Sequence, residues 1–361
     1  MHWLPIALLL AVVAAVLAAR LRRRGEEAQA YLKGVRSMIS DDPDAAIEAL
    51  SDAARLGTPE AVETYLALGE LFRRTGDLTR AIRLHRNMLH RPGLDPSRKS
   101  EVERELAEDY RRSGMLSEAA DIYRPLAAAD RAAAEGLRDV LVAQGRLEEA
   151  TAVHRDLCPP DARLLAHLLA GTARAALGAD PEGARSAARL ACEADGSSAD
   201  ALLALALAEA AGGDAAVAAG SVARALSADP AAALLAWGPL AALPADRALA
   251  VVEEAGRSRT GDARLMLLRG RLLAREGRTE ESLAEVRRAM DVDADGEVTL
   301  ALREILREAK APPPAELPAR HDLMVAALVR HVRLLRCRRC GAGAPVRDWR
   351  CPRCGVFDAY P

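Results

Sequence analysis

Hydrophobic residues occur in two ways along the chain, first as one uninterrupted run and then as short groups that recur with helical spacing. The run extends from Trp3 to Ala19, contains no charged residue, and is followed by four arginines within residues 20–24. From there to about residue 310, apolar positions return every three to four residues, as on the buried faces of helices. This distribution predicts one membrane segment followed by a long helical region.

Residues 1–24 are predicted to form a transmembrane anchor with a basic stop. The uncharged run is at the short end of the ~17–25 residues that span a bilayer as a helix. A cleaved signal peptide is the alternative, because AVLAA resembles a cleavage site. However, no Lys or Arg precedes the run, and the arginines that follow it keep the downstream chain in the cytoplasm by the positive-inside rule. We therefore expect a single-pass membrane protein whose bulk faces the cytoplasm.

Residues 27–310 are predicted to form an all-α solenoid of tetratricopeptide repeats. The clearest unit, residues 65–88, contains the motif Y-x2-L-G-x2-F, a Gly-Asp turn and a small residue, as expected for a repeat of about 34 residues. Gly69 and Ala81 are expected where two helices cross closely, and Gly76 where the first helix ends. The units around 164–196 and 232–262 are assigned from spacing alone. The expected turn glycines are Gly76, Gly114, Gly145, Gly178, Gly213 and Gly277.

Aromatic, histidine and isolated cysteine residues inside the array are interpreted as packing or repeat-surface residues rather than ligands. The aromatic residues fall at repeat core positions, and no acidic or cysteine residue recurs beside the histidines. The residues concerned are Tyr65, Phe72, Tyr110, Tyr123, His85, His90, His154, His167, Cys158 and Cys192.

The array is followed by three short segments. Residues 311–318, APPPAELP, are predicted to form a stiff linker because proline prevents helix formation. Residues 319–335 place their apolar side chains on one side, which predicts an amphipathic connecting helix. Residues 336–361 form a separate small domain that contains four of the six cysteines.

These four cysteines have the spacing C-x2-C-x10-C-x2-C. Two C-x2-C turns supply the four thiolates that a tetrahedral Zn²⁺ ion requires, and Gly341 and Gly355 follow the second cysteine of each pair, where the turn is tightest. We therefore predict a rubredoxin-like zinc ribbon with one zinc ion per chain. Trp349 and Phe357 are expected in its small core or in its contact with the solenoid. The predicted ligands are Cys337, Cys340, Cys351 and Cys354.

Other interpretations of the cysteines are less consistent with the rest of the chain. Paired disulfides would need an oxidising compartment, which conflicts with the predicted cytoplasmic side. Catalytic zinc is disfavoured because four thiolates leave no open coordination position. Iron in a rubredoxin-like site is the alternative metal, since spacing alone does not distinguish it from zinc. The neighbouring arginines are interpreted as solvated charges that offset the thiolates: Arg336, Arg338, Arg339, Arg347, Arg350 and Arg353.

Composition agrees with helices and argues against two classes of function. Half of the residues are hydrophobic, chiefly Ala and Leu, whereas only 3% are aromatic, which favours helices over strands. The 50 basic residues are balanced by 52 acidic ones, so a nucleic-acid binder is not indicated. No phosphate-binding loop and no nucleophile–base pair stands out, and we expect no catalytic residues.

The order of anchor, repeats and terminal cysteines resembles the lipopolysaccharide assembly protein B family of bacterial inner-membrane proteins. The resemblance lies in residues 30–50 and 66–89 and in the W-x-C-P-x-C run of residues 349–354, and extends over about residues 1–130 and 335–357. It implies a non-enzymatic adaptor that helps a membrane-bound AAA+ protease degrade the deacetylase that commits precursors to lipid A. It also implies contact with a membrane lipopolysaccharide sensor and a metal on the four terminal cysteines. A general scaffold for envelope-biogenesis enzymes is the alternative function, and a homodimer is among the assemblies that the sequence allows.

Overall fold

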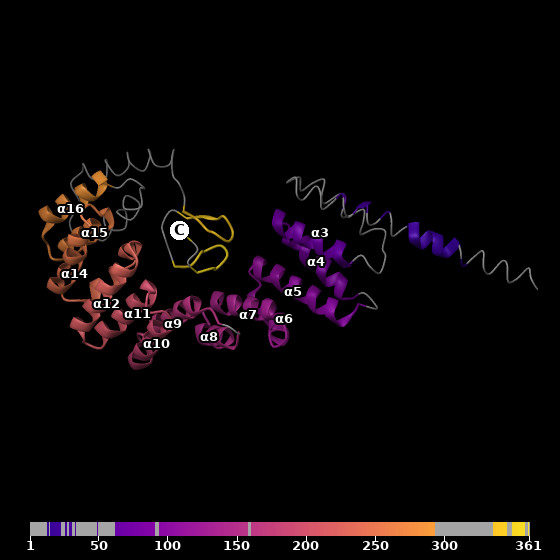
Figure 1. Ribbon diagram of the computed structural model, residues 1–361, viewed down its shortest axis with the longest axis horizontal. Coiled ribbons are helices and arrows are strands. Elements are labelled where there is room, and N and C mark those ends of the chain that lie inside the picture. The colour runs from indigo at the N-terminus through magenta and orange to yellow at the C-terminus, as the bar shows by residue number, and fades with distance from the viewer. Residues whose placement is uncertain are drawn as a thin grey trace, which may run out of the picture. The chain divides into compact units, whose positions relative to one another are not determined.

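The computed structural model describes residues 62–90, 94–157, 160–292, 335–344, 349–357 and 360, together with Val13, residues 15–22, Glu26, residues 29–30, Lys33 and Ala49. The chain divides into two compact units, residues 1–144 and 145–361. In both units the described elements are almost entirely helices, each packed on helices next to it in the chain (Figure 1). The prediction of an all-α array of stacked helices is confirmed within each unit.

Several predicted segments lie wholly or mostly outside the described residues. These are the anchor at 1–24, the first repeat before residue 62, the linker at 311–318 and the connecting helix up to residue 334, as well as Cys158 and Arg347. Leu335, predicted as the last residue of the connecting helix, belongs to a strand. Within the part of the chain that is described, no helix combines the length and the apolar character needed to cross a bilayer.

Unit 1 contains five described helices that stack in chain order. The helices α3, α4 and α5 contact one another, and α6 then packs on both α5 and α7. Contact between successive helices is typical of helical repeats, in which one pair alone cannot bury its apolar face. The helices are α3 (Val62–Thr75), α4 (Leu78–Leu89), α5 (Pro96–Ser113), α6 (Leu116–Leu126) and α7 (Arg131–Ala143).

The helix ends follow local rules that are visible in the sequence. Gly76 and Gly114 adopt φ values of 86° and 82°, which residues with a β-carbon resist. After them, the backbone N–H of Asp77 donates to the carbonyl of Phe72, and that of Met115 to Tyr110, which satisfies carbonyls at the helix end. Many helices begin at an acidic residue whose carboxylate accepts from the first turn: Asp77, Asp95, Asp130, Asp161, Asp180 and Asp262.

The helices of unit 1 approach closely at two glycines. A β-carbon on Gly69 of α3 would lie 2.2 Å from Nε2 of His85 on α4, and one on Gly136 of α7 would lie 2.5 Å from Cζ of Tyr123 on α6. At distances this short, a larger residue would require the facing side chain or the helices to shift. The prediction that Gly69 is small because two helices cross there is confirmed. Among the predicted core aromatics, Phe72 and Tyr123 are buried, whereas Tyr65 and Tyr110 are half-buried.

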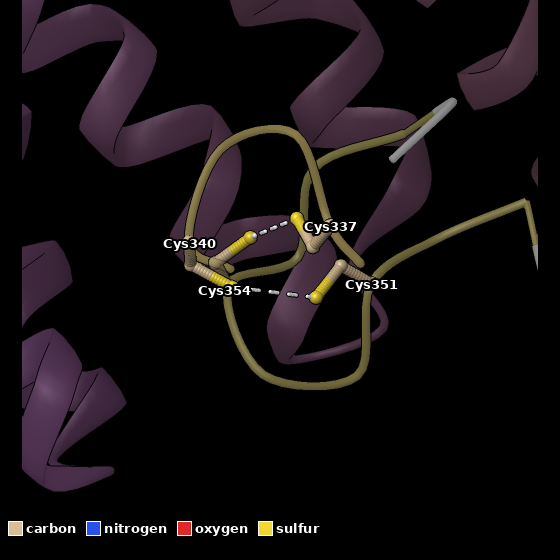
Figure 2. A group of neighbouring side chains, drawn as sticks. All are labelled: Cys337, Cys340, Cys351 and Cys354. Atoms are coloured by element: carbon tan, nitrogen blue, oxygen red, sulfur yellow. Dashed lines mark hydrogen bonds between the residues drawn. The ribbon is translucent and has the colours of Figure 1, made fainter. Parts of the chain in front are cut away.

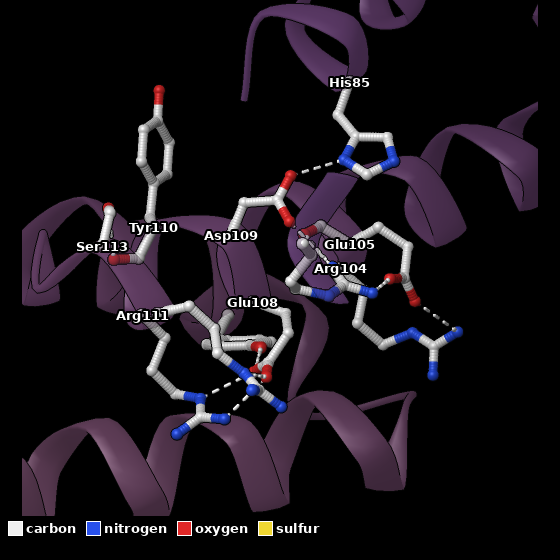
Figure 3. Close-up of polar contacts among 11 residues, drawn as sticks. His85, Arg104, Glu105, Glu108, Asp109, Tyr110, Arg111 and Ser113 are labelled. Atoms are coloured by element: carbon white, nitrogen blue, oxygen red, sulfur yellow. Dashed lines mark hydrogen bonds and ion pairs between the residues drawn. The ribbon is translucent and has the colours of Figure 1, made fainter. Parts of the chain in front are cut away.

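A buried carboxylate links three helices of unit 1 (Figure 3). Asp109 on α5 is fully buried; one of its oxygens lies 2.6 Å from Nδ1 of His85 and the other accepts from Nη1 of Arg73 at 2.8 Å. Arg73 also contacts Glu105 at 2.6 Å. The argument that histidines in the array lack acidic partners is therefore wrong for His85. Its partner is 24 residues away and is brought beside it only when α5 packs on α4.

Glu108, on the same helix, is part of a second polar cluster. Its carboxylate accepts from Arg111 at 2.6 Å and from Arg112 at 2.8 Å, and the hydroxyl of Tyr123 lies 3.4 Å away. Burial by itself would raise the pKa of Glu108, but the hydrogen bonds and charges of the two arginines lower it to about 2. The carboxylate is therefore held in its charged form by its neighbours.

The substitution Glu108→Gln is expected to destabilise the protein at neutral pH and to reduce its sensitivity to acid. A carboxyl group whose pKa falls from 4.5 to about 2 on folding contributes stability above about pH 4.5, and this contribution is lost as the pH falls through about 2. We expect it to be roughly 1–3 kcal/mol. Urea denaturation at several pH values between about 7 and 2 measures it. Glu135→Gln, which removes an exposed pair with Arg131, is the control and should change stability by less than about 1 kcal/mol. Equal pH profiles for the two variants would contradict the expectation.

Unit 2 begins with helix pairs that are built largely from alanine. The helix α9 packs on α8, α10 and α11, and α11 packs on α10 and α12 (Figure 1). Buried alanines such as Ala170, Ala188 and Ala204 line these contacts, and their small size lets the helices approach closely. The helices are α8 (Leu147–Asp156), α9 (Ala162–Ala176), α10 (Pro181–Ala194), α11 (Ala199–Ala211) and α12 (Ala215–Ala228).

The helix α11 is the central helix of unit 2. Nearly all of its residues are buried, including Asp200 and Glu209. A helix that is apolar on every side is buried on every side, and the two acidic residues are satisfied by partners. Glu209 accepts from Ser221 at 2.7 Å, and the partners of Asp200 are described below. Cys192 on α10 packs against the apolar clusters on either side of α11 and behaves as a packing residue, as expected.

The last helices of unit 2 include one irregular repeat. Where residues 232–262 were expected to contain a helix pair, the first helix is replaced by η1 (Pro230–Leu234) and the short α13 (Trp237–Ala242), followed by α14 (Ala245–Ser258). Prolines within and after this stretch prevent one longer helix. Regular pairing resumes with α15 (Ala263–Arg275) and α16 (Thr279–Val292).

No glycine with positive φ lies between α13 and α14, where the turn inside this repeat falls; Gly261, with a φ of 89°, follows α14. The end of α13 is satisfied by Arg275 of α15, which donates to the carbonyls of Ala241 at 2.9 Å and Leu243 at 3.2 Å. An arginine from the next repeat therefore satisfies the carbonyls at the helix end, which a glycine turn satisfies in the other repeats. Gly178, expected as a turn glycine, lies in a turn but is not among the glycines with positive φ.

Candidate metal centre

The terminal cysteines lie in two turns that repeat each other with an offset of 14 residues. In the first, β1 (Leu335–Arg336) pairs antiparallel with β2 (Gly343–Ala344), so that Arg336 faces Gly343. In the second, Arg350 and Phe357, the residues 14 positions later, form an antiparallel bridge. We call the described residues 335–344, 349–357 and 360 the terminal knuckles.

Hydrogen bonds within the two turns repeat in the same way. The backbone N–H of Cys337 donates to Ala342 at 2.9 Å, and that of Cys351 donates to Val356 at 2.8 Å. The N–H of each glycine donates back to the first cysteine of its turn, at 2.9 Å in both cases. Gly341 and Gly355 have φ values of 67° and 73°, which confirms that the tight turn depends on glycine there.

The four cysteine sulfurs converge on one point (Figure 2). All four ligand atoms lie within 4.8 Å of one another; Sγ of Cys337 is 3.6 Å from that of Cys354, and Sγ of Cys340 is 3.7 Å from that of Cys351. Adjacent sulfurs of a tetrahedral zinc site are about 3.8 Å apart, because each Zn–S bond is about 2.3 Å. Disulfide sulfurs would be about 2.0 Å apart. The geometry therefore fits a four-thiolate metal site and not paired disulfides.

The groups around Cys351 favour its thiolate form, whereas those around Cys354 favour its thiol form. Burial would raise the pKa of Cys351, but backbone N–H groups of Cys354 and Arg353 and the hydroxyl of Tyr360 lower it to about 6. Burial and the neighbouring sulfurs raise the pKa of Cys354 to about 12. Four thiols this close cannot all lose their protons unless a cation compensates the charge, which is what a divalent metal supplies.

The terminal knuckles pack against α9 of the same unit. The ring of Phe357 is stacked on the imidazole of His167, with ring centroids 5.0 Å apart and an interplanar angle of 14°. Trp349 lies 5.8 Å from the same imidazole and packs against the apolar cluster formed by α11 to α15. Of the two positions expected for Trp349 and Phe357, the structure shows the contact with the solenoid.

The ring of His167 contacts the buried carboxylate of Asp200. Its Nδ1 lies 2.6 Å from one oxygen of Asp200, and the other oxygen accepts from Nη1 of Arg174 at 2.5 Å. Asp200 is fully buried and His167 is nearly so. The argument that no acidic residue accompanies the histidines is wrong here also, since the partner lies 33 residues away on α11. No local pattern marks this pair, and sequence reasoning missed it.

The arginines near the cysteines are only in part the solvated charges that were predicted. Arg336, Arg338, Arg339 and Arg353 are exposed, as expected. Arg350 is half-buried and donates to the carbonyl of Gly355 at 3.0 Å, and Arg336 makes the equivalent contact with Gly341 at 3.3 Å. These two arginines therefore also brace the turns that carry the cysteines.

The arrangement fits a closed metal site. Three of the four cysteines are buried, and the fourth is half-buried, so four thiolates could surround one ion without an open position. The buried His85–Asp109 pair of unit 1 is not suited to catalysis, because the second ring nitrogen of His85 faces Gly69 and the ring is fully buried.

Comparison with known proteins gives a partial similarity. No model of a known protein family matches the chain. A segment of 96 residues is 31% identical to lipopolysaccharide assembly protein B of Escherichia coli strain K12, and the same holds for the O6:H1 and O157:H7 strains. The match covers 27% of this chain and 24% of the relative, so the chain matches about a quarter of the length of these proteins. The predicted resemblance is confirmed to this extent.

Among solved structures, a tetratricopeptide repeat protein from Parabacteroides merdae ATCC 43184 covers 78% of this chain and 99% of its own. Its TM-score is 0.32 and its sequence identity 18%.

Proposed function

We propose that this protein is a membrane-tethered, non-enzymatic adaptor that regulates lipopolysaccharide biosynthesis. The observation that carries the proposal is the 31% identity over 96 residues to lipopolysaccharide assembly protein B. The helical repeats and the knuckles with four converging cysteines support it, because both are binding modules rather than reaction centres.

In this proposal Cys337, Cys340, Cys351 and Cys354 bind one zinc ion, with iron as the alternative metal. Their thiolates would surround the ion completely, so that the metal stabilises the knuckles and supplies no reactive position. The ion would thereby keep Trp349 and Phe357 presented to His167.

The tether in this proposal is the uncharged run between Trp3 and Ala19, placed in the bacterial inner membrane with the repeats in the cytoplasm. The adaptor would bring the committed-step deacetylase of lipid A synthesis to a membrane-bound AAA+ protease. A membrane lipopolysaccharide sensor would report how much lipopolysaccharide is required. Tethering raises the effective concentration of a bound client near a membrane protease without any new contact.

The proposal is tested by the half-life of the deacetylase after protein synthesis is stopped. Depletion of the adaptor should lengthen this half-life several-fold, and the full chain should restore it. The chain that lacks residues 1–24 should not restore it, because the client would no longer be held at the membrane. An unchanged half-life on depletion would contradict the proteolytic role.

A general scaffold for envelope-biogenesis enzymes is the second candidate. The repeats favour it, because stacked helix pairs bind protein surfaces whether or not proteolysis follows. A scaffold should still retain biosynthetic enzymes in a pull-down when the anchor is deleted and should leave the deacetylase half-life unchanged.

A further inference from the structure

Tyr360 places a buried hydroxyl beside the cysteine cluster. Its side chain is 3% exposed and packs with Cys337, Cys351 and Cys354. Within the described residues, the hydroxyl oxygen is completely buried and has no hydrogen-bond partner that meets ordinary geometry. A buried hydroxyl without a partner loses the hydrogen bonds that it makes with water, so its position here needs a physical reason.

The reason lies in the sulfur that the hydroxyl approaches. Tyr360 packs in one buried cluster with Cys351, whose sulfur is the one that interacts with the Tyr360 side chain. A neutral thiol is a weak acceptor, whereas a thiolate is a strong one.

The sequences of the two C-x2-C segments differ at this position. The residue 14 positions before Tyr360 is Val346, whose side chain has no hydrogen to donate. The backbone N–H donors to sulfur are provided by the turn itself, as for Cys351 and Cys354. The hydroxyl of Tyr360 is therefore an addition to the second turn that the C-x2-C spacing does not require.

We propose that the Tyr360 hydroxyl donates a hydrogen bond to the Cys351 thiolate of the metal-loaded site and thereby strengthens metal binding. This inference rests on the proposed metal site. Tyr360 is a positioning residue, because it acts through Cys351 and does not touch the ion. Outer groups that hydrogen-bond to metal ligands typically change metal affinity by about 10–100-fold.

The experiment compares the full-length protein with Tyr360→Phe, which removes only the hydroxyl. Zinc affinity is measured by competition with a chelator, and the cobalt(II)-loaded proteins are compared by absorption spectroscopy. We expect zinc affinity to fall about tenfold. We also expect the sulfur-to-cobalt charge-transfer band to move to lower energy, because a thiolate that loses a hydrogen bond gives up its electrons more easily. The ligand-field bands of tetrahedral cobalt should persist.

Two further variants separate the hydroxyl from packing. Tyr123→Phe removes a phenolic hydroxyl in unit 1 and should leave zinc affinity and the cobalt spectrum unchanged. Tyr360→Leu removes the ring as well as the hydroxyl. If Tyr360→Phe matches the wild type and only Tyr360→Leu is altered, Tyr360 acts through packing and the inference is wrong.

The remaining outcomes are equally decisive. If the wild type binds cobalt with four thiolates but Tyr360→Phe shows neither a weaker affinity nor a shifted band, the metal site stands and the inference fails. If the wild type binds neither zinc nor cobalt, the proposed metal site and the inference fail together. Loss of the tetrahedral bands in Tyr360→Phe would also contradict it, since one hydroxyl would then determine folding instead of affinity.

Discussion

Removal of the metal is expected to unfold the terminal knuckles while the helices between residues 62 and 292 stay folded. The knuckles contain strands of only two residues, and their buried cluster consists of cysteines with Tyr360 and a few partly buried apolar residues. So small a core cannot offset the conformational entropy of the chain. Binding of a structural zinc ion contributes about 10–16 kcal/mol in comparable small domains, which makes this the largest effect that we expect.

Cys337→Ser in the full chain, or a chelator added to the wild type, provides the measurement. Each should make the segment after residue 334 susceptible to limited proteolysis and should change the fluorescence of Trp349, which leaves its contact with His167. The helical circular dichroism should change little. The control is Cys192→Ser, since Cys192 lies on α10 outside the cluster. Knuckles that resist proteolysis equally with and without metal would show that the sulfurs do not need an ion.

Replacement of Asp200 by alanine is expected to destabilise unit 2 by about 3–5 kcal/mol. The carboxylate lies between His167 and Arg174 and is itself fully buried. Its removal leaves a buried imidazole and a guanidinium without their acceptor, and such unpaired groups cost more than the pair contributes. The substitution should also weaken the stacking of Phe357 on His167, because Asp200 fixes the orientation of the His167 ring.

Urea denaturation followed by tryptophan fluorescence measures this effect, since the described tryptophans Trp237 and Trp349 both lie in unit 2. Asp214→Ala is a suitable control, because Asp214 is half exposed and pairs with Arg185 at 3.4 Å. It should change stability by less than about 1 kcal/mol. Asp200→Asn, which keeps the shape, should fall between the two. A denaturation midpoint for Asp200→Ala equal to that of the wild type would mean that the buried pair is not stabilising.

Features with a local cause could be predicted from the sequence. Helix faces follow from a 3.6-residue period, and the ends at Gly76 and Gly114 follow from a backbone angle that other residues resist. The two C-x2-C turns follow from the spacing of the cysteines and from the glycine after each pair. Each of these features depends on a few neighbouring residues, so each could be predicted from the amino-acid sequence. The same applies to the resemblance in residues 66–89, which is a repeat motif.

Contacts between residues far apart in the chain could not be predicted from the sequence and are known from the fold. His85 meets Asp109 and His167 meets Asp200 because successive helices pack, and neither spacing is typical of any local motif. Phe357 stacks on His167 of α9, although most of unit 2 separates the two residues in the chain. The carbonyls at the end of α13 accept hydrogen bonds from an arginine of α15. Periodicity specifies which face of a helix is buried, but the neighbour that covers this face depends on how whole helices stack. That is why the sequence alone was sufficient to predict that the four cysteines come together, whereas the surface on which they pack had to be read from the fold.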